Sequence, residues 1–226
     1  MSPSWNIEAL RKHIDALGTD RELHGAVDAI DRYVWIFRYH LRTARDAMKG
    51  IVHDDDPRGI KNMQLVFGSD DRQDAYNQAK LISEAHLLSC LHCARAMFDI
   101  FSHLVNGLMM EKVIPVRYCT LKKVAKRLPV CPLKSELQSL LENKWFKYVD
   151  GFLNTAKHRG LVQHSFHVSF IDASAGIRLA GFEYEGITHP QYSADELLRG
   201  VLEVKNKIVD CGMLLNDAVI ASAVTL

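Results

Sequence analysis

The chain has 226 residues, of which 48% are apolar and 24% charged, and its formal charge at pH 7 is +1. This composition is typical of a globular protein and excludes a disordered tail or a collagen-like repeat. A chain of this length buries roughly 70% of the surface that it exposes when unfolded, so it needs no disulfide or structural metal to fold. The five cysteines are odd in number and lack the spacing of a secreted framework. We therefore expect a reduced, cytoplasmic protein.

Neither a leader nor a membrane helix is predicted. Residues 1–5 lack the basic and apolar regions of a secretory signal. The most apolar stretch, 98–110, contains Asp99, His103 and Asn106, and it falls short of the roughly 20 apolar residues that a membrane helix needs. We expect no membrane partner.

The N-terminal part, residues 1–70, is predicted to form a helical hairpin. Its first helix covers 7–17, between Asn6 as N-cap and Gly18, and the second runs from Arg21, after Thr19 or Asp20 as the cap, to about Met48, before Gly50. Residues 53–71 read as a loop with a short turn at 60–67.

The central part, 71–160, is dominated by one long helical pattern from Asp74 to about Met110, with apolar residues in two rows. A helix that is apolar on two sides is expected in the middle of a bundle. Prolines separate the shorter helices that follow, which we predict at 120–128, 133–142 and 144–158.

After Gly160 the hydrophobic period changes from helical to alternating. Phe166 and Val168 alternate with polar neighbours, residues 172–176 read as a turn, and 177–184 as a returning strand. We thus predict a β-hairpin within 161–185 and a C-terminal helix over 193–222, capped by Ser193. The predicted fold is a single, mostly α domain over 1–226, a helical bundle with a long central helix and a β-hairpin inserted before the C-terminal helix.

Charge is distributed unevenly along the chain. The segment from Lys112 to Arg159 contains eleven basic and three acidic residues, a net charge of +8, while the rest of the chain sums to −7. Such a segment suits a phosphate-bearing partner. The alternative is a solvated helix face, because the apolar residues at 121, 124, 125 and 128 form one stripe and leave the lysines between them in water.

Two groups of polar residues are candidate binding sites. In the long helix, Arg95, Asp99 and His103 belong to one polar row, which indicates a pocket or an interface, or alternatively an Arg95–Asp99 pair one turn apart. In the helix that ends near residue 159, the polar residues are Asn154, Lys157, His158 and Arg159. Favourable charge at a helix C-terminus explains the cations but not Asn154.

No cofactor is predicted. His86, Cys90 and Cys93 share one helix face and would suit zinc if a fourth ligand came from elsewhere. The same positions complete an apolar seam, where free cysteine packs as a small hydrophobe, so core packing is favoured and we expect no metal. Phosphate-binding glycine loops, dinucleotide fingerprints and nucleophile elbows do not occur.

Two stretches carry a family resemblance. The helix end Asn154-Thr-Ala-Lys-His-Arg159, followed by the hairpin and the last helix, and the preceding helix with Leu91-His-Cys-Ala-Arg-Ala-Met-Phe-Asp-Ile-Phe-Ser-His-Leu-Val-Asn106, resemble uncharacterised bacterial proteins of the HEPN superfamily over about 75–222. The resemblance implies a helical bundle that forms homodimers. Many members of this superfamily are metal-independent ribonucleases of toxin–antitoxin, CRISPR and phage-defence systems, and others only bind nucleotides or partners. The resemblance therefore implies one of these two kinds of function.

The resemblance further implies an active-site test. Catalytic members carry Arg, a polar residue, two to four more residues and then His, and Arg159 and His164 have this spacing. Gly160 stands where the polar residue is usual, and His164 falls on a predicted strand. In that chemistry His164 would move a proton at the ribose 2′-oxygen or the leaving oxygen, and Arg159 would stabilise the charged phosphorane.

The resulting hypothesis is a protein of a bacterial stress or defence system that associates with RNA or a nucleotide, with Arg159 and His164 as the catalytic pair if it is an enzyme. Its predicted binding residues are Arg95, Asp99, His103, Asn154, Lys157 and His158. The alternative is a non-catalytic scaffold or regulatory subunit that acts through protein–protein contacts, in which the same residues tie helices together. An open basic cleft around Asn154 and His158 would favour the first, and backbone-bonded, buried side chains the second.

Overall fold

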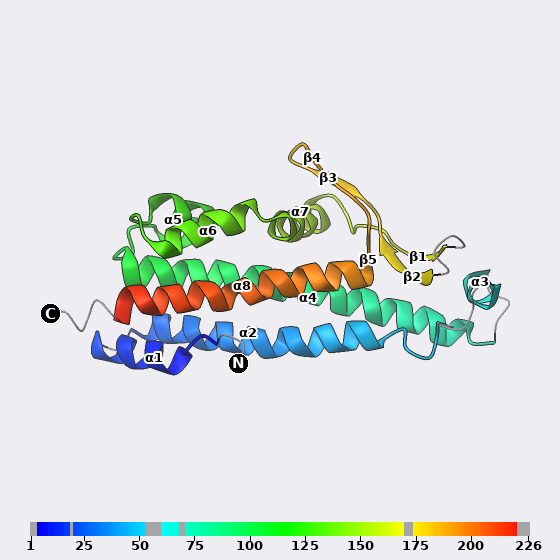
Figure 1. Ribbon diagram of the computed structural model, residues 1–226, viewed down its shortest axis with the longest axis horizontal. Helices are drawn as coiled ribbons and strands as arrows, with labels where there is room; N and C mark the ends of the chain where they lie inside the picture. The colour runs from blue at the N-terminus through cyan, green and yellow to red at the C-terminus, as the bar shows by residue number, and fades with distance from the viewer. Residues whose placement is uncertain (1–3, 19, 53–59, 68–70, 170–173, 221–226) are drawn as a thin grey trace. The chain divides into compact units, whose positions relative to one another are not determined.

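The computed structural model describes residues 4–18, 20–52, 60–67, 71–169 and 174–220, and it confirms the mostly α fold with a long central helix (Figure 1). The helices are α1 (Ile7–Ala16), α2 (Arg21–Asp46), α3 (Ile60–Phe67), α4 (Gln73–Met109), the short 3₁₀ helix η1 (Val116–Tyr118), α5 (Leu121–Arg127), α6 (Pro132–Glu142), α7 (Lys144–His158) and α8 (Ala194–Ile220). No helix of the described ranges combines the length and the apolarity needed to cross a membrane.

Helix boundaries follow the predicted capping residues. The Asn6 side chain accepts a hydrogen bond from the Ala9 amide, and the Asp20 side chain accepts one from the Leu23 amide. Thr120, predicted as the first residue of a helix, is instead the N-cap of α5 and accepts a hydrogen bond from the Lys123 amide. Ser193 and Glu196 form a reciprocal capping box, in which each side chain accepts a hydrogen bond from the other residue's amide. The chain leaves α7 through Gly160, whose φ of +132° is a left-handed conformation that glycine adopts without strain.

The chain divides into two compact units, each of which is described by itself. Unit 1 contains residues 1–36, 93–147 and 202–226, and unit 2 contains 37–92 and 148–201. The predicted N-terminal part, 1–70, therefore contributes to both units. The single domain over 1–226 stays a prediction.

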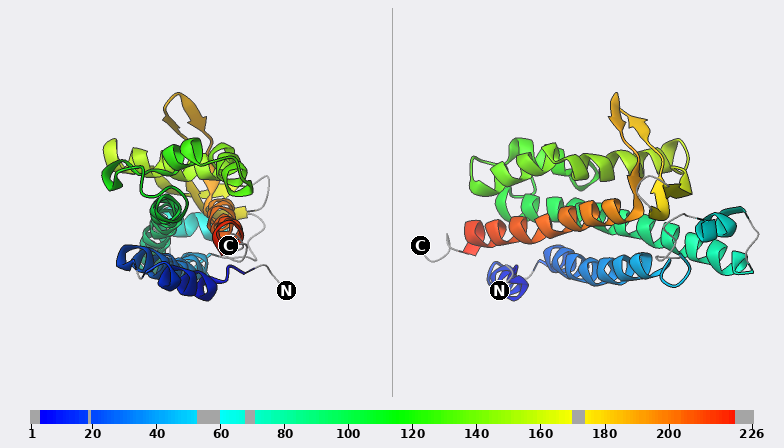
Figure 2. Two further views of the ribbon diagram at one scale, coloured as in Figure 1. Left: turned by 90° about the vertical axis from the view of Figure 1, so that its left-hand side faces the viewer. Right: turned by 45° about the vertical axis from the view of Figure 1, so that its right-hand side comes forward.

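Unit 1 is a layered helical assembly. α5 and α6 lie on one side of the parts of α4 and α8 that belong to this unit, and α1 and the start of α2 lie on the other (Figures 1 and 2). In the middle layer the side chains of Phe98, Phe101 and Leu104 are fully buried. The two apolar rows of α4 thus have the partners that a central helix requires.

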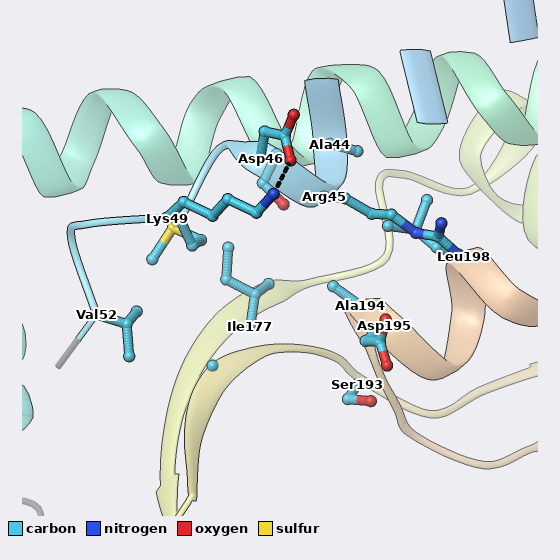
Figure 3. A pocket seen from close by; sticks show the side chains of 13 residues that line it. Ala44, Arg45, Asp46, Lys49, Val52, Ile177, Ser193, Ala194, Asp195 and Leu198 are labelled. Carbon is cyan, nitrogen blue, oxygen red and sulfur yellow. Dashed lines mark ion pairs between the residues drawn. The ribbon is translucent and has the colours of Figure 1, made fainter. Parts of the chain in front are cut away.

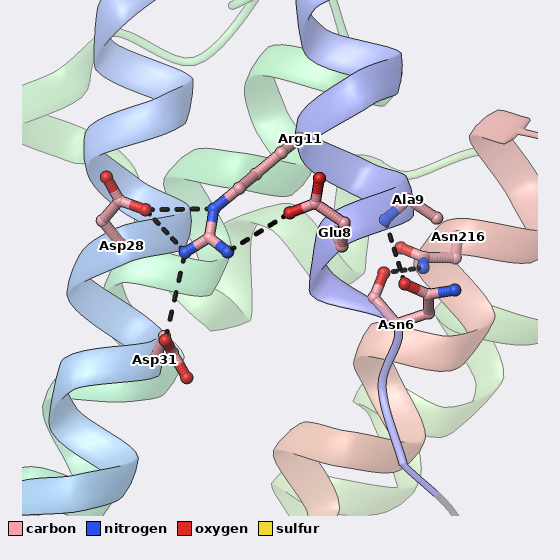
Figure 4. A network of polar contacts seen from close by, with 7 residues as sticks. All are labelled: Asn6, Glu8, Ala9, Arg11, Asp28, Asp31 and Asn216. Atoms are coloured by element: carbon pink, nitrogen blue, oxygen red, sulfur yellow. Dashed lines mark hydrogen bonds and ion pairs between the residues drawn. The ribbon is translucent and has the colours of Figure 1, made fainter.

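The N-terminus of α1 is held to α8 inside unit 1. Asn216 accepts a hydrogen bond from the indole of Trp5 at 3.0 Å and donates one to the Asn6 carbonyl at 2.7 Å. On the other side of α1, Arg11 donates to Asp28 of α2 at 2.7 Å (Figure 4). These contacts give the first helix a fixed place in unit 1.

Unit 2 contains the strands, and here two details of the prediction were wrong. β1 (His164–Ser169) and β2 (Ser174–Leu179) form the expected antiparallel hairpin, but the returning strand ends at Leu179. β3 (Phe182–Tyr184) pairs instead with β4 (Ile187–His189) in a second hairpin, and β5 (Tyr192–Ser193) pairs with β2. The turn predicted at 172–176 was also placed wrongly, because residues 174–176 belong to β2. Residues 172 and 173 lie outside the described ranges.

The second hairpin projects from the rest of unit 2 (Figures 1 and 2). The chain turns away from β2 at Gly181, where an added Cβ atom would lie 2.9 Å from the His189 carbonyl oxygen. It reverses at Glu185 and Gly186, whose φ values of 50° and 76° are left-handed. The alternation of apolar and polar residues predicted one strand over 177–184. The backbone conformation that these turns require divides it into β2 and β3.

The cysteines of α4 are core residues. Cys90 is fully buried, Cys93 is 5% exposed, and burial raises the pKa of the Cys93 thiol to about 11. His86 contacts His40 of α2, with 2.9 Å between the two Nδ1 atoms. Among the described residues, no three side chains of the ligand types come together as a metal site.

Candidate functional site

The polar row of α4 is engaged within unit 1. Arg95 forms the predicted alternative, a pair with Asp99 at 3.0 Å between Nη1 and Oδ1, and its guanidinium carbon lies 5.7 Å from the centre of the Phe146 ring. His103 lines a small cavity of about 160 Å³ together with Asn106 and Lys112. The salt bridge lies within α4, whereas the contact with Phe146 favours a role of Arg95 in holding α4 to α7.

The polar end of α7 lies in unit 2. Asn154 is half-buried and donates from Nδ2 to the Asp150 carbonyl of its own helix at 2.9 Å. This hydrogen bond explains how an asparagine, a poor helix former, is accommodated inside α7. Lys157 and His158 are exposed in the last turn, where positive charge stabilises the helix. The convergence of this group with Arg95, Asp99 and His103 stays a prediction, because the two groups belong to different units.

Arg159 and His164 are both committed to other contacts. The Arg159 guanidinium donates to the Glu183 carbonyl at 3.0 Å and lies over the Tyr184 ring. The His164 side chain is only 2% exposed, and its Nδ1 atom lies 3.6 Å from the Glu84 carboxylate.

Burial, together with the smaller effect of the nearby Lys80 charge, lowers the pKa of His164 to about 4. The Glu84 carboxylate acts in the opposite direction, but its separation exceeds hydrogen-bond length, so burial prevails. A neutral imidazole is a competent base, but a buried one does not reach a phosphodiester in solvent. Cleavage by Arg159 and His164 therefore stays a prediction that no contact in the structure supports.

A second candidate, which we name the α5 cationic surface, lies on η1 and α5 of unit 1. Its members are Arg117, Tyr118, Lys122, Lys123, Lys126 and Arg127. All six are exposed, whereas Leu121, Val124, Ala125 and Leu128 are buried. The amphipathic pattern predicted for this helix is thus confirmed.

Tyr118 lies at the edge of this surface between two cations. The Arg117 guanidinium carbon is 4.6 Å and the Lys123 Nζ atom 5.0 Å from the centre of its ring. The tyrosine is 47% exposed, so the ring is a partly open, flat surface with positive charge beside it.

The cations of this surface lie beyond salt-bridge distance of every described carboxylate, although the pKa of Glu142, lowered chiefly by the hydrogen bond from Lys147, is also lowered at longer range by Lys122. Within the described ranges, Arg117, Lys122, Lys123, Lys126 and Arg127 form no salt bridge. Elsewhere in unit 1 cations are paired, as Lys112 is with Asp20 and Lys207 with Glu136. An unpaired cluster of this kind produces a positive potential at the surface of the protein.

Packing beneath the surface fixes its geometry. Lys134 of α6 donates to the Leu128 carbonyl at 2.7 Å, just after the last residue of α5. Before α5, the buried Cys119 thiol donates to the Ser102 carbonyl of α4 at 3.4 Å. The surface is therefore attached at both ends to the rest of unit 1.

No protein-family model, no curated protein and no solved structure matches the chain. The HEPN resemblance and the homodimer that it implies remain predictions from the sequence.

Sequence reasoning found the basic segment but not its aromatic member. The available signal was an Arg-Tyr pair followed five residues later by Lys123, directly before the amphipathic helix. Only the structure shows that both cations lie against the same ring.

Proposed function

We propose that this protein binds single-stranded RNA through the α5 cationic surface. The observation that carries the proposal is Tyr118, an exposed ring flanked by Arg117 and Lys123. Single-stranded nucleic acids are bound by cations that contact phosphates and by aromatic rings on which bases stack. The resemblance to the HEPN superfamily supports the same class of partner and implies a role in bacterial stress response or defence.

The arrangement of charge on α5 suits an extended strand. Lys122 and Lys126 are four residues apart, as are Lys123 and Arg127, so both pairs follow the helix axis on its exposed side. Four residues of helix advance by about 6 Å. A flexible strand can place successive phosphates along such a row while a base stacks on Tyr118.

Binding is tested by fluorescence anisotropy with a labelled single-stranded RNA and the full chain. Because one stacked base is worth about 1–3 kcal/mol, we expect Tyr118→Ala to weaken binding roughly 5- to 150-fold, and Tyr118→Phe to retain it. Equal affinity of Tyr118→Ala and the unmodified chain would contradict the proposal.

The charged contacts are tested by salt dependence. Replacing Lys122 and Lys126 by Gln should reduce the slope of log K against log salt by about 0.7 for each lost phosphate contact. Lys12→Gln with Arg32→Gln is the matched control, since both residues are exposed in the same unit but lie on α1 and α2. An equal loss of slope in the control would indicate unspecific attraction.

A scaffold role is the second candidate. The observation that favours it is that Arg95, Asp99 and Asn154 are bonded within their own helices. A folded chain that binds no RNA at low salt would favour the scaffold. The same samples, incubated in EDTA beside an Arg159→Ala/His164→Ala variant, test cleavage.

A further inference from the structure

We propose that a cavity in unit 2 binds a small amphipathic anion, a molecule with one carboxylate or phosphate group on an aliphatic body. The cavity measures about 530 Å³, within the range of small-molecule sites. The elements around it are the end of α2, α4, β2 and the start of α8 (Figure 3). The proposal does not depend on RNA binding, because the α5 cationic surface belongs to the other unit.

One end of the cavity offers positive charge. Arg45 extends from the end of α2 in the direction of Leu198 of α8 (Figure 3). In the part of the chain that the structure describes, its guanidinium makes no hydrogen bond or salt bridge. It lowers the pKa of Asp46, but the largest cause of that shift is the hydrogen bond from Lys49.

The acidic residues of the cavity already have partners. Asp46 is paired with Lys49, and Asp195 with Arg199 one turn further along α8. The unpaired charge at the cavity is therefore that of Arg45, which favours an anion over a cation.

Ala194 and Asp195 form the first turn of α8, a helix of 27 residues. The amides of this turn and the helix dipole favour negative charge. The capping box occupies the amides of Ser193 and Glu196, so the helix start adds to the effect of Arg45 and is not a site by itself.

Ser83 of α4 is the observation that points to a ligand. It is 2% exposed and lines the cavity. Two other serines of α4, Ser89 and Ser102, each donate to the carbonyl four residues earlier at 2.8 Å. For the Ser83 hydroxyl no hydrogen bond occurs among the described residues.

Since Ser83 lines the cavity and makes no hydrogen bond among the described residues, its hydroxyl can donate one to a ligand there. An anionic group in the cavity would accept this hydrogen bond. Ser83 and Arg45 thus define the head-group end of the proposed site.

The remaining lining defines the body of the ligand. It is aliphatic, with Ala44, Met48, Val52, Ile177 and Leu198. None of the described lining residues is aromatic, so the cavity offers no stacking partner for a nucleobase. An aliphatic chain or small branched group matches this surface.

The experiment measures binding of octanoate and octyl phosphate to the full chain by calorimetry and by melting temperature. We expect both to bind, because they combine an anionic head with an aliphatic body, and their relative affinities separate the two head groups. Octanol, octyltrimethylammonium and inorganic phosphate each lack one of the two features, so they should bind at least tenfold more weakly.

Two variants locate the site. Arg45→Gln should weaken octanoate binding at least tenfold, in line with the loss of a hydrogen bond between charged groups. Ser83→Ala should weaken it about 3- to 10-fold, in line with the net contribution of one ordinary hydrogen bond. Arg42→Gln is the matched control, since Arg42 is exposed on α2 three residues before Arg45 and does not line the cavity. RNA binding should be unchanged in all three.

The proposal is overturned if no octyl anion binds the folded chain. Equal binding of octanol or octyltrimethylammonium would also overturn it, because partition into an apolar surface would then suffice. Unchanged octanoate affinity in both Arg45→Gln and Ser83→Ala would place the ligand elsewhere and contradict the assignment.

Discussion

Units 1 and 2 differ in whether their buried polar side chains have hydrogen-bond partners. In unit 1, Asn106 is 3% exposed and bonds to both backbone groups of Ile114, and Asn216 bridges Trp5 and Asn6. In unit 2, both ring nitrogens of His164 are buried without a hydrogen bond among the described residues. The Ser83 hydroxyl, which lines the cavity of this unit, also makes none.

The difference indicates where each unit acts. A satisfied interior stabilises unit 1 and leaves binding to its exposed side, where the α5 cationic surface lies. Buried polar groups without partners are uncommon in native proteins, so those of unit 2 mark places where a ligand or a water belongs. Next to His164 there is a cavity of about 10 Å³, lined also by Glu84, which is close to the room that one water needs.

The largest effect is expected where a satisfied group of unit 1 is removed. Asn106→Ala deletes the hydrogen bonds to the Ile114 amide and carbonyl, at 3.1 and 2.8 Å, and leaves both buried. The free energy of unfolding, measured in urea, should fall by about 3 kcal/mol.

Ser102→Ala is the matched control, since Ser102 is also buried in α4 but donates only to the Phe98 carbonyl of its own helix. It should change stability by less than about 1 kcal/mol. A smaller loss for Asn106→Ala than for Ser102→Ala would remove the contrast between the units.

An effect of similar size is expected from pH in unit 2. Burial lowers the pKa of His164 from 6.5 to about 4, so between these values the unfolded chain binds more protons than the folded one. The contribution of this group to stability is fully present above pH 6.5 and is lost as the pH falls toward 4, by up to about 3 kcal/mol.

Since other groups also titrate in this range, the measurement compares the unfolding free energy of the unmodified chain with that of His164→Leu from pH 7 to 4. The variant should lose less stability on acidification. Parallel curves would show that His164 is protonated in the fold, for example through Glu84.

The next effect depends on close packing in unit 1. Replacing a helical glycine by alanine should lower the stability at one position and raise it at another. A Cβ atom at Gly212 would lie 2.1 Å from the Trp5 ring, whereas at Gly25 it meets nothing within 4 Å. Gly212→Ala should therefore destabilise the chain by about 1–3 kcal/mol. Gly25→Ala should stabilise it by about 0.4–1 kcal/mol. Two substitutions of the same sign, measured by thermal unfolding, would show that Trp5 does not pack as described.

The smallest effect is expected at the exposed ion pairs of α1 and α2. Arg11 lies 2.7 Å from Asp28 and 3.9 Å from Asp31, with both carboxylates well exposed. Exposed pairs contribute at most about 1 kcal/mol, so Arg11→Ala should lower the melting temperature by less than about 4 °C. A larger drop would mean that this network, and not the Trp5–Asn216 contact, attaches α1.

Most of the helices were predictable because local capping residues define their ends. Asn6, Asp20 and Ser193 cap the helices that the sequence assigned to them, and the apolar rows of α4 indicate its length. The second hairpin was missed because its strands are three residues each. Its turn depends on a left-handed backbone conformation at Glu185 and Gly186. The alternation of apolar and polar residues carries no information about this conformation.

The candidate sites were predictable only in part. Net charge located the basic segment, but spacing could not show that His164 is buried or that Arg159 bonds to Glu183. The cavity of unit 2 was missed because its lining comes from elements far apart in the chain, such as Ser83 and Ile177. Proximity of this kind arises from packing and leaves no local signal.

The most direct test of RNA binding is photo-crosslinking of a single-stranded RNA to the full chain, followed by mass spectrometry of the digested protein. The account predicts adducts on the α5 cationic surface, with Tyr118 as the main site. Adducts confined to residues 150–164 would contradict it and would assign RNA binding to the end of α7 and to His164.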